Sequence, residues 1–563
     1  MAVSGRQHSD NSARVTDKGA RQKMATGFDG IYGLHQGFLQ SVDRHSGRPA
    51  LEVQGAQYSY SDLYHQAAAV GAALQSAMPE TTAPLVGVLA NRSLPVYSGL
   101  LGTLMAGKAV VPLNPGFPQE RTQQMVEQAG LQALVADGQG EALLSDLLPG
   151  MDVPMVVVLP LAESAQALQA RFPQHRFLTR AELGAPSDWR PASVQPDDLA
   201  YLFFTSGSTG TPKGVGVLHR NALRFVAMSL ERYRPFGISE ADRFSQFYDI
   251  TFDSSMFDLY VSWAFGACLC CPTAKEWFNP NKYIEEGRLS VIDITPSAGH
   301  GMNRRDGWRP GRFQALRLCR FGGEALSAEL ATAMAAAAPH ARVDNAYGPT
   351  ECTVDSAYYL WDPERSPGEC EHGMVPIGYP GNQVQLTVVD DDLQPVPEGA
   401  EGELLIGGPQ VTPGYWNDPE RTEQAFIRLP SDGAVHYRTG DLVRRPPAGK
   451  PIMFLGRMDH QIKVGGVRIE LGEVEQALRE AAATDEAVAL GWPRTSSGAA
   501  GIVGFVVAGT ADEAAIRDQL RSRLPSVMVP RVIHALEALP LNPNGKVDRK
   551  ALMARLEAEA GGR

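Results

Sequence analysis

The chain of 563 residues is long enough for one large domain and a smaller one, or for several domains. Hydrophobic residues make up 44% and charged residues 20%, as in ordinary folded globular proteins. The net charge of -12, from 51 basic and 63 acidic residues, argues against broad binding to nucleic acid or to an anionic membrane. A phosphorylated ligand would therefore need a local binding site.

The N-terminal segment and the cysteines constrain the cellular location. Residues 1–26 are polar and mildly basic and lack the apolar stretch of a signal peptide, so we expect a disordered tail, with Met24 as an alternative start to Met1. No apolar run reaches the roughly 18 residues of a membrane span. Six cysteines are too few for a disulfide framework in so long a chain, and the strand-like setting of 268–271 predicts core packing rather than zinc binding. We expect a reducing cytoplasm.

Helical and strand patterns alternate through the first two thirds of the chain. The pattern at 59–78 predicts an amphipathic helix with Leu63, Ala67, Val70 and Leu74 on one face. Short, nearly continuous apolar runs follow, each ended by turn residues or a helical pattern, which is typical of parallel strands buried on both faces. These runs are 85–89, 109–113, 133–136, 155–159, 199–204, 291–295 and 316–321. The alternation predicts a layered α/β domain.

The texture changes twice in the last third. Residues 380–445 are punctuated by Gly and Pro and predict a β-rich subdomain with strands at 385–390, 403–406 and 436–438. A new unit follows 456–459 and predicts a small α/β domain of roughly one hundred residues. Its expected elements are a helix at 473–482, strands at 487–491 and 501–507, and a helix at 512–524. The Ala-rich stretch 331–338 predicts a helix.

One loop carries the strongest chemical signal. The apolar run 199–204 predicts a strand that ends in Thr-Ser-Gly-Ser-Thr-Gly-Thr-Pro-Lys-Gly (205–214). Such a loop can direct several backbone N–H groups and hydroxyls at one phosphate, and Lys213 adds a positive charge. The order differs from Walker A because Gly214 follows Lys213. The composition of this loop alone would also fit a mobile linker. The inference of a phosphate-binding loop therefore rests on the order of its residues.

Other strings recur in a fixed order along the chain. Taken singly, Glu351 could be a surface carboxylate, Asp441 a turn residue and Lys546 a solvated loop lysine. Together with 205–214, however, they form an ordered set that resembles the adenylate-forming superfamily, and within it the adenylation domains of nonribosomal peptide synthetases, from about residue 50 to 552. The matching strings are 104–115, 252–255, 345–351, 402–408, 437–442, 456–475, 524–530 and 543–548.

The resemblance implies a fold with two domains. A large N-terminal layered α/β domain, with two sheets flanked by helices plus a β-rich subdomain, would span 27–456 after the tail 1–26. A hinge at 457–460, centred on Asp459, would lead to a small mobile C-terminal α/β domain at 461–563. The small domain would deliver the catalytic Lys546 and then rotate so that a carrier-bound phosphopantetheine thiol can attack the adenylate.

The resemblance also implies an ATP site. Thr350 would touch the α-phosphate, Glu351 would bind Mg²⁺, and Lys546 would bridge the carboxylate, the α-phosphate and the ribose. Asp441 would accept hydrogen bonds from the ribose hydroxyls, with Arg457 nearby. The remaining positions would hold the β- and γ-phosphates or form the adenine slot: Thr205, Ser206, Gly207, Ser208, Thr209, Gly210 and Lys213 for the phosphates, and Gly323, Glu324, Asn345 and Tyr347 for adenine.

The predicted substrate is a polar amino acid. Asp253 stands where amino-acid-activating members of the superfamily place the carboxylate that binds the substrate's amino group, although it could also be a helix N-cap. The other pocket positions implied are Ser254, Phe257, Asp293, Arg320, Gly322, Ala346, Val354 and Asp355. Two carboxylates and an arginine disfavour a hydrophobic side chain. Arg320 could pair with Asp293 and leave Asp355 for a donor, or clamp a substrate carboxylate or amide. Glutamine, glutamate, basic and β-amino acids remain open.

Two partners and two alternative functions complete the expectation. Only 17 residues follow Lys546, so we expect a free-standing enzyme that delivers its product to a separate carrier protein. Many relatives of this type need a small MbtH-like helper protein, and we expect the same dependence here. An aryl- or acyl-CoA ligase is the enzymatic alternative, and a non-catalytic binding protein of the same fold is the other. We expect neither nucleic acid nor membrane as a partner.

Overall fold

The structure is a computed structural model. It describes residues 32–78, 85–151, 153–207, 212–429, 433–458, 461–495, 498–507, 512–541 and 547–561. The tail 1–26 lies outside these residues, as do Ser208, Thr209, Gly210, Asp459 and Lys546, so the expectations for them remain predictions.

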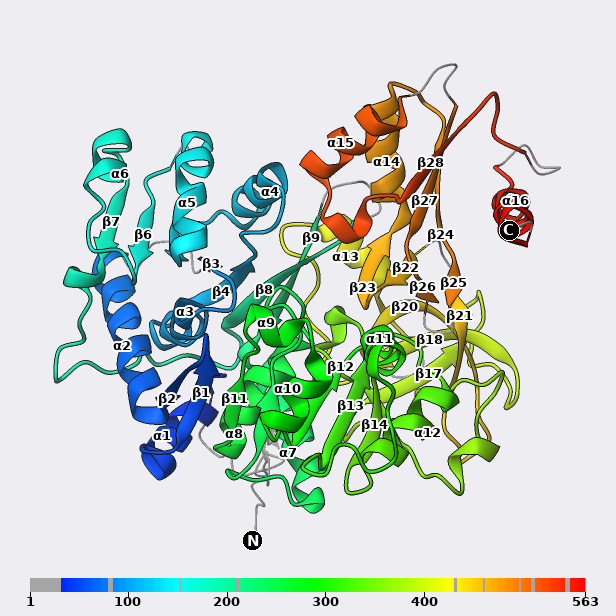
Figure 1. Cartoon of the computed structure of the whole chain (residues 1–563), viewed down its shortest axis with the longest axis horizontal. Helices are drawn as coiled ribbons and strands as arrows, with labels where there is room; N and C mark the ends of the chain where they lie inside the picture. Colours follow the sequence, from blue (N-terminus) through cyan, green and yellow to red (C-terminus); the bar gives the residue numbers. More distant parts are fainter. Residues whose placement is uncertain are drawn as a thin grey trace, which may run out of the picture. The chain divides into compact units, whose positions relative to one another are not determined.

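The first group of predicted strands forms a seven-stranded sheet within the described residues (Figure 1). All pairings in it are parallel except the last, which is an antiparallel pair. In spatial order the strands are β7 (Arg176–Thr179), β6 (Val156–Leu159), β5 (Ala133–Ala136), β3 (Leu85–Leu89), β4 (Ala109–Leu113), β8 (Leu199–Thr205) and β9 (Lys213–Leu218). Every residue of β3, β4 and β5 is buried, which explains their continuous apolar sequence.

Helices flank this sheet, and one shows how the sequence sets its ends. Helix α2 (Tyr60–Ala77) begins after Ser59, whose side chain forms a capping box with Asp62. Leu63, Ala67, Val70 and Leu74 are at most 1% exposed, so the predicted face is confirmed. Alongside it runs α3 (Leu94–Met105), and the other helices of this part are α4 (Gln119–Ala129), α5 (Gly138–Leu147) and α6 (Gln166–Arg171) (Figure 1).

A second, nine-stranded sheet carries the later predicted strands. Its central strands pair in parallel and its edges end in antiparallel pairs. The order is β16 (Tyr379–Pro380), β15 (Ala357–Leu360), β14 (Arg342–Tyr347), β13 (Leu318–Gly322), β12 (Val291–Ile294), β10 (Arg243–Ser245), β11 (Cys268–Cys270), β1 (Pro49–Val53) and β2 (Ala56–Ser59). The helices of this part are α1 (Gln36–His45), α7 (His219–Tyr233), α8 (Ser262–Phe265), α9 (Ala274–Trp277), α10 (Pro280–Glu286), α11 (Pro296–Asp306) and α12 (Ala328–Ala337).

The predicted β-rich subdomain is an antiparallel sheet of β17 (Gln385–Val389), β18 (Glu401–Gly407), β20 (Val435–Arg444), β19 (Phe426–Arg428) and β21 (Met453–Arg457), with α13 (Pro419–Ala425) beside β19. Strand β20 is longer than the predicted 436–438 because it pairs with β18, β19 and β21 along its length. Strand β13 begins at Leu318 rather than at residue 316, although Leu316 is buried.

The C-terminal part contains two further sheets. One has the order β23 (Val467–Glu470), β22 (Gln461–Val464), β26 (Gly498–Ala499) and β25 (Arg494–Thr495). The other has β24 (Ala487–Gly491), β27 (Ile502–Val507) and β28 (Val532–Leu536). Helices α14 (Leu471–Ala482), α15 (Glu513–Arg523) and α16 (Arg549–Gly561) complete this part. The expected α/β class, with a large N-terminal and a small C-terminal domain, is confirmed.

The cysteines behave as core residues. All six are unpaired, and those of β11 are buried. Glu52 on the neighbouring strand lies within 4.8 Å of the Cys268 and Cys270 thiols. Its carboxylate, however, forms an ion pair with Arg243 at 2.8 Å. Among the described residues, no helix is long and apolar enough to cross a membrane.

Candidate active site

A cavity of about 700 Å³ opens at the carboxyl ends of β12, β13 and β14. Parallel strands present their C-terminal ends at one edge of a sheet, which is where open α/β sheets bind ligands. Asp293 comes from β12, Arg320 and Gly322 from β13, and Ala346 from β14, and all four line the cavity. Asp253, Ser254, Val354 and Asp355 line it as well, so eight of the nine predicted pocket residues meet there.

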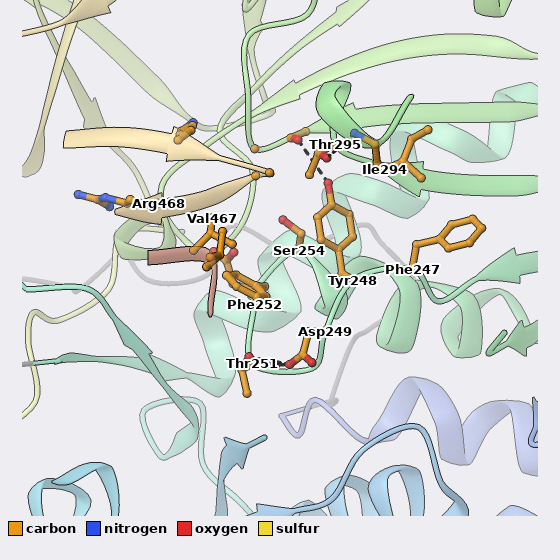
Figure 2. A pocket seen from close by; sticks show the side chains of 18 of the residues that line it. Phe247, Tyr248, Asp249, Thr251, Phe252, Ser254, Ile294, Thr295, Val467 and Arg468 are labelled. Atoms are coloured by element: carbon orange, nitrogen blue, oxygen red, sulfur yellow. Dashed lines mark hydrogen bonds between the residues drawn. The ribbon is translucent and has the colours of Figure 1, made fainter. Parts of the chain in front are cut away.

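Asp253 lies in a loop that faces this edge of the sheet. Burial raises its pKa to about 6, and the hydroxyl of Thr350 partly opposes the shift. The residue as a whole is half-buried and lines the cavity wall. The helical segment that follows begins at Ser255, so Asp253 is not the residue directly before it. Figure 2 shows the neighbouring Ser254 beside Tyr248, whose hydroxyl donates to the Gly322 carbonyl at 3.3 Å.

A row of charges forms the floor of the cavity. Strand pairing places Asp293 directly beside Arg320, so the predicted positions are in register. The Arg320 guanidinium donates to Asp293 through Nη1 and to Asp355 through Nη2, the latter at 2.5 Å. Phe257 is buried and does not line the cavity; instead its ring lies under the guanidinium, 4.5 Å from Cζ. Arg320 therefore pairs internally with both carboxylates.

The phosphate-type loop connects β8 to β9, and the end that follows β8 lies at the cavity. Thr205 and Ser206 line the cavity wall. The Ser206 hydroxyl donates to the Arg468 carbonyl at 2.8 Å, and the Gly207 N–H donates to the Glu473 carboxylate at 3.2 Å. The Glu473 carboxylate thus accepts a hydrogen bond from this loop, as a phosphate oxygen would.

Glu351 is a fully buried carboxylate surrounded by cations. Its Oε1 accepts from the Tyr415 hydroxyl at 2.8 Å and lies 3.3 Å from Lys213 Nζ, while Oε2 is 2.9 Å from Arg468 Nη1. Burial alone would raise its pKa, but Arg468 and Lys213 hold it well below its usual range. The carboxylate is therefore ionised and suited to a hard cation.

A third group of polar residues lies where β14 and β20 approach the cavity. Tyr347 donates through its hydroxyl to Asp441, and Arg457 donates to the other oxygen of Asp441 at 2.7 Å. Tyr347, Asp441, Arg457 and Gly323 line the cavity. Two of the predicted adenine-slot residues do not line the cavity: Asn345 donates to the Pro376 carbonyl, and Glu324 accepts from the backbone N–H groups of Ser297 and Gly466.

Several residues at the site were not assigned from the sequence. Arg468 and Glu473 lie inside the string 456–475, but nothing in that string shows that they reach Glu351 and Gly207. Lys463 of the same string lines the cavity, and burial lowers its pKa. Helix α4 adds Arg121, which forms a 2.5 Å buried ion pair with Glu473. These contacts join residues that are far apart in the sequence, so no local string predicts them.

Comparison with known proteins identifies relatives of the chain. The model of the AMP-binding enzyme family matches residues 38–416, and that of the AMP-binding enzyme C-terminal domain matches residues 473–546. The chain is 33% identical to tyrocidine synthase 3 and 31% identical to tyrocidine synthase 1, both of Brevibacillus parabrevis, over 92% of its own length. It spans only 7% and 44% of those two synthases.

A solved structure extends the likeness to three dimensions. The adenylation domain AlmE of Vibrio cholerae, in complex with glycyl-adenosine-5'-phosphate, is 28% identical to the chain. The match has a TM-score of 0.82 and covers 93% of this chain and 98% of AlmE.

Proposed function

The chain belongs to the AMP-binding enzyme family, and from this premise we propose that it activates a polar amino acid with ATP and transfers it to a carrier-bound thiol. The observation that carries the proposal is the cavity itself. This one cavity is lined by Asp253, by Thr205 and Ser206 of the phosphate-type loop, and by Asp441.

The first half-reaction makes a poor electrophile reactive. The carboxylate of the amino acid attacks the α-phosphorus of ATP, pyrophosphate leaves, and an aminoacyl adenylate forms. The protein's part is to align the two reactants and to supply positive charge to the phosphate oxygens. The ionised form of Asp253 would hold the substrate's ammonium group, with Ser254 beside it.

The ATP-binding roles follow the chemistry of the donors. Thr350 would contact the α-phosphate, and Lys546 would bridge the reacting carboxylate and phosphate. Asp441 would receive the ribose hydroxyls in place of Tyr347 and Arg457. The β- and γ-phosphates would be held by Thr205, Ser206, Gly207, Ser208, Thr209, Gly210 and Lys213. The adenine slot would be formed by Gly323 and Tyr347, the two predicted adenine residues that line the cavity.

A magnesium ion fits the same site through Glu351. The buried carboxylate takes two cationic side chains in this structure, so its surroundings tolerate a positive charge at its oxygens. Bound there, Mg²⁺ would neutralise charge on the phosphates during transfer. Lys213 would remain close enough to share that charge.

The second half-reaction transfers the aminoacyl group from AMP to a phosphopantetheine thiol on a carrier protein. The thiol sulfur attacks the adenylate carbonyl, and AMP leaves. Rotation of the C-terminal domain about Asp459 would remove Lys546 and admit the thiol. The unpaired cysteines support a reducing compartment, the cytoplasm, for this chemistry.

Amino-acid-dependent ATP–pyrophosphate exchange tests the proposal. We expect exchange with an amino acid and none with aryl or fatty acids. Exchange confined to aryl or fatty acids, with thioester formation on free CoA, would replace it by a CoA ligase. We also propose dependence on an MbtH-like helper protein; soluble, active enzyme made without such a helper would contradict that part alone.

A further inference from the structure

The substrate pocket contains more buried carboxylates than it has cations to balance them. Asp293 and Asp355 share one guanidinium, Arg320, and Asp258 is a third carboxylate in the same electrostatic neighbourhood. All three are at most 3% exposed. If all four groups are ionised, this cluster of Asp258, Asp293, Asp355 and Arg320 has a net charge of −2, which is costly away from water.

The nearby cations do not remove this surplus. Arg232 pairs with Asp344 at 2.5 Å, although Asp344 lies beside Arg320 in the strand register. Arg92 directs its guanidinium to the carbonyls of Gln246 and Phe247 and stacks on the ring of Trp277. Within the described residues, Arg320 is thus the cation that contacts the cluster.

Unused hydrogen-bonding capacity accompanies the surplus charge. One oxygen each of Asp293 and Asp355, and both oxygens of Asp258, have no donor at normal hydrogen-bond geometry within the described part of the chain. Two donors are nevertheless close enough to lower the pKa of these carboxyls: the Tyr248 backbone N–H for Asp258 and the Tyr358 hydroxyl for Asp355. Among the described residues, Asp293 keeps an oxygen with no such donor, although native proteins pair nearly all buried groups.

The local backbone explains why the third carboxylate turns inward. Residues Phe257–Val261 form a π-helical turn, a rare conformation that is frequent at functional sites. It buries Phe257 and Asp258 together, with the Phe257 ring under Arg320. Burial is also the largest cause that raises the pKa of Asp258, and it raises that of Asp293 to about 7. Burial thus opposes full ionisation of these two carboxylates while, in the part of the chain that the structure describes, no cation other than Arg320 contacts them.

We propose that the activated amino acid carries a second cationic nitrogen, an ammonium or guanidinium on its side chain, which Asp355 receives. This inference rests on the proposed function and narrows its substrate. Asp355 is the contact residue, because it lines the cavity and is the most exposed of the three carboxylates. Asp293 and Asp258 act behind it, by holding Arg320 and by making the pocket negative.

Arg320 does not clamp an anionic substrate in this arrangement. Both of its terminal nitrogens donate to carboxylates, and one face of its guanidinium lies on Phe257. A glutamate side chain would meet Asp355 without a free cation. A hydrocarbon side chain would leave the unpaired oxygens buried, at a cost in affinity.

The space for such a side chain comes from Gly322. A Cβ built there would meet the Ala346 carbonyl at 3.6 Å, the Tyr248 hydroxyl at 3.9 Å and Arg320 Nη2 at 4.0 Å. These are ordinary van der Waals distances, so the position is open and lies directly at the charged floor. A longer side chain can therefore reach Asp355 past Gly322.

Amino acids that lack only the terminal ammonium test the charge without any variant. ATP–pyrophosphate exchange is measured with lysine against norleucine and with ornithine against norvaline, and with arginine, glutamine and glutamate. We expect kcat/KM for a cationic amino acid to exceed that of its analogue without the terminal ammonium by about 30-fold or more, the usual result of leaving a buried charge unpaired. Preference for glutamine, glutamate or norleucine would overturn the inference and leave amino-acid adenylation standing.

A variant then tests the residue. Asp355→Asn should lower kcat/KM for the cationic substrate by about 30-fold or more and shift preference towards glutamine, with the KM for ATP unchanged. The matched control is Asp391→Asn, because Asp391 is an exposed carboxylate of the β-rich subdomain. An unchanged lysine-to-norleucine ratio in a folded Asp355→Asn enzyme would refute the assignment. Failure of every amino acid to support exchange in the wild-type enzyme would instead refute the proposed function.

Discussion

Replacing Arg468 by Met tests the contacts that the C-terminal domain makes with the ATP site. The substitution keeps much of the apolar stem and removes the charge that lies 2.9 Å from Glu351. Breaking a buried ion pair costs about 3–5 kcal/mol when the partner is left alone. Here Lys213 at 3.3 Å and the Tyr415 hydroxyl at 2.8 Å remain, so we expect a smaller loss of about 2 kcal/mol.

That loss should fall on one half-reaction. With Arg468 on Glu351 and the Glu473 carboxylate at the Gly207 N–H, the proposed metal and phosphate positions are filled by the protein. The arrangement therefore fits the state after pyrophosphate has left. A penalty of about 2 kcal/mol lowers its population about 30-fold relative to the ATP-bound state.

The assay compares two rates on the same protein. ATP–pyrophosphate exchange reports adenylation, and formation of the thioester on free phosphopantetheine reports transfer. We expect the ratio of transfer to exchange to fall about 30-fold in Arg468→Met and to stay constant in Arg494→Met, a matched change at an exposed position of the same domain. An unchanged ratio of transfer to exchange, whether or not both rates fall, would refute the reasoning.

Four further outcomes are expected. Because burial raises the pKa of Asp253 to about 6, kcat/KM for the amino acid should fall about tenfold per pH unit below 6, and a flat profile from pH 5 to 8 would contradict this. The same shift contributes stability that is present below pH 3.8 and lost as the pH rises through about 6. Gly322→Leu should fill the pocket floor and reduce exchange with lysine far more than with alanine. In Gly348→Ala the new Cβ would come 2.3 Å from the Val354 carbonyl, so we expect about 1–3 kcal/mol lost and a lower melting temperature.

Local sequence patterns were sufficient to predict helices and strands. They were not sufficient to predict features that depend on pairing between distant residues. The helix at 59–78 could be predicted because its cap and its buried stripe are encoded within its own residues. Strand β20 was predicted too short, since its length depends on three partners far away in the sequence. The register of Asp293 with Arg320 likewise depends on pairing between β12 and β13, which no local string specifies.

The site shows the same division. Residues in distinctive strings, such as Thr350 and Asp441, meet at the cavity as predicted. Asp258 was missed because a π-helical turn, not an ordinary helix, determines where its side chain points. Arg468 was missed because its contact with Glu351 joins residues 117 positions apart. The predictions for Asp459 and Lys546 stay predictions.

The shared guanidinium of Arg320 has a consequence for how such a pocket can change over generations. Replacing Arg320 alone leaves two buried carboxylates without a cation, whereas replacing Asp293 or Asp355 alone leaves Arg320 with one carboxylate partner. Substitutions at these three positions should therefore be strongly non-additive. A lineage that acquires a neutral substrate can lose a carboxylate first, but it can lose the arginine only together with, or after, its carboxylate partners.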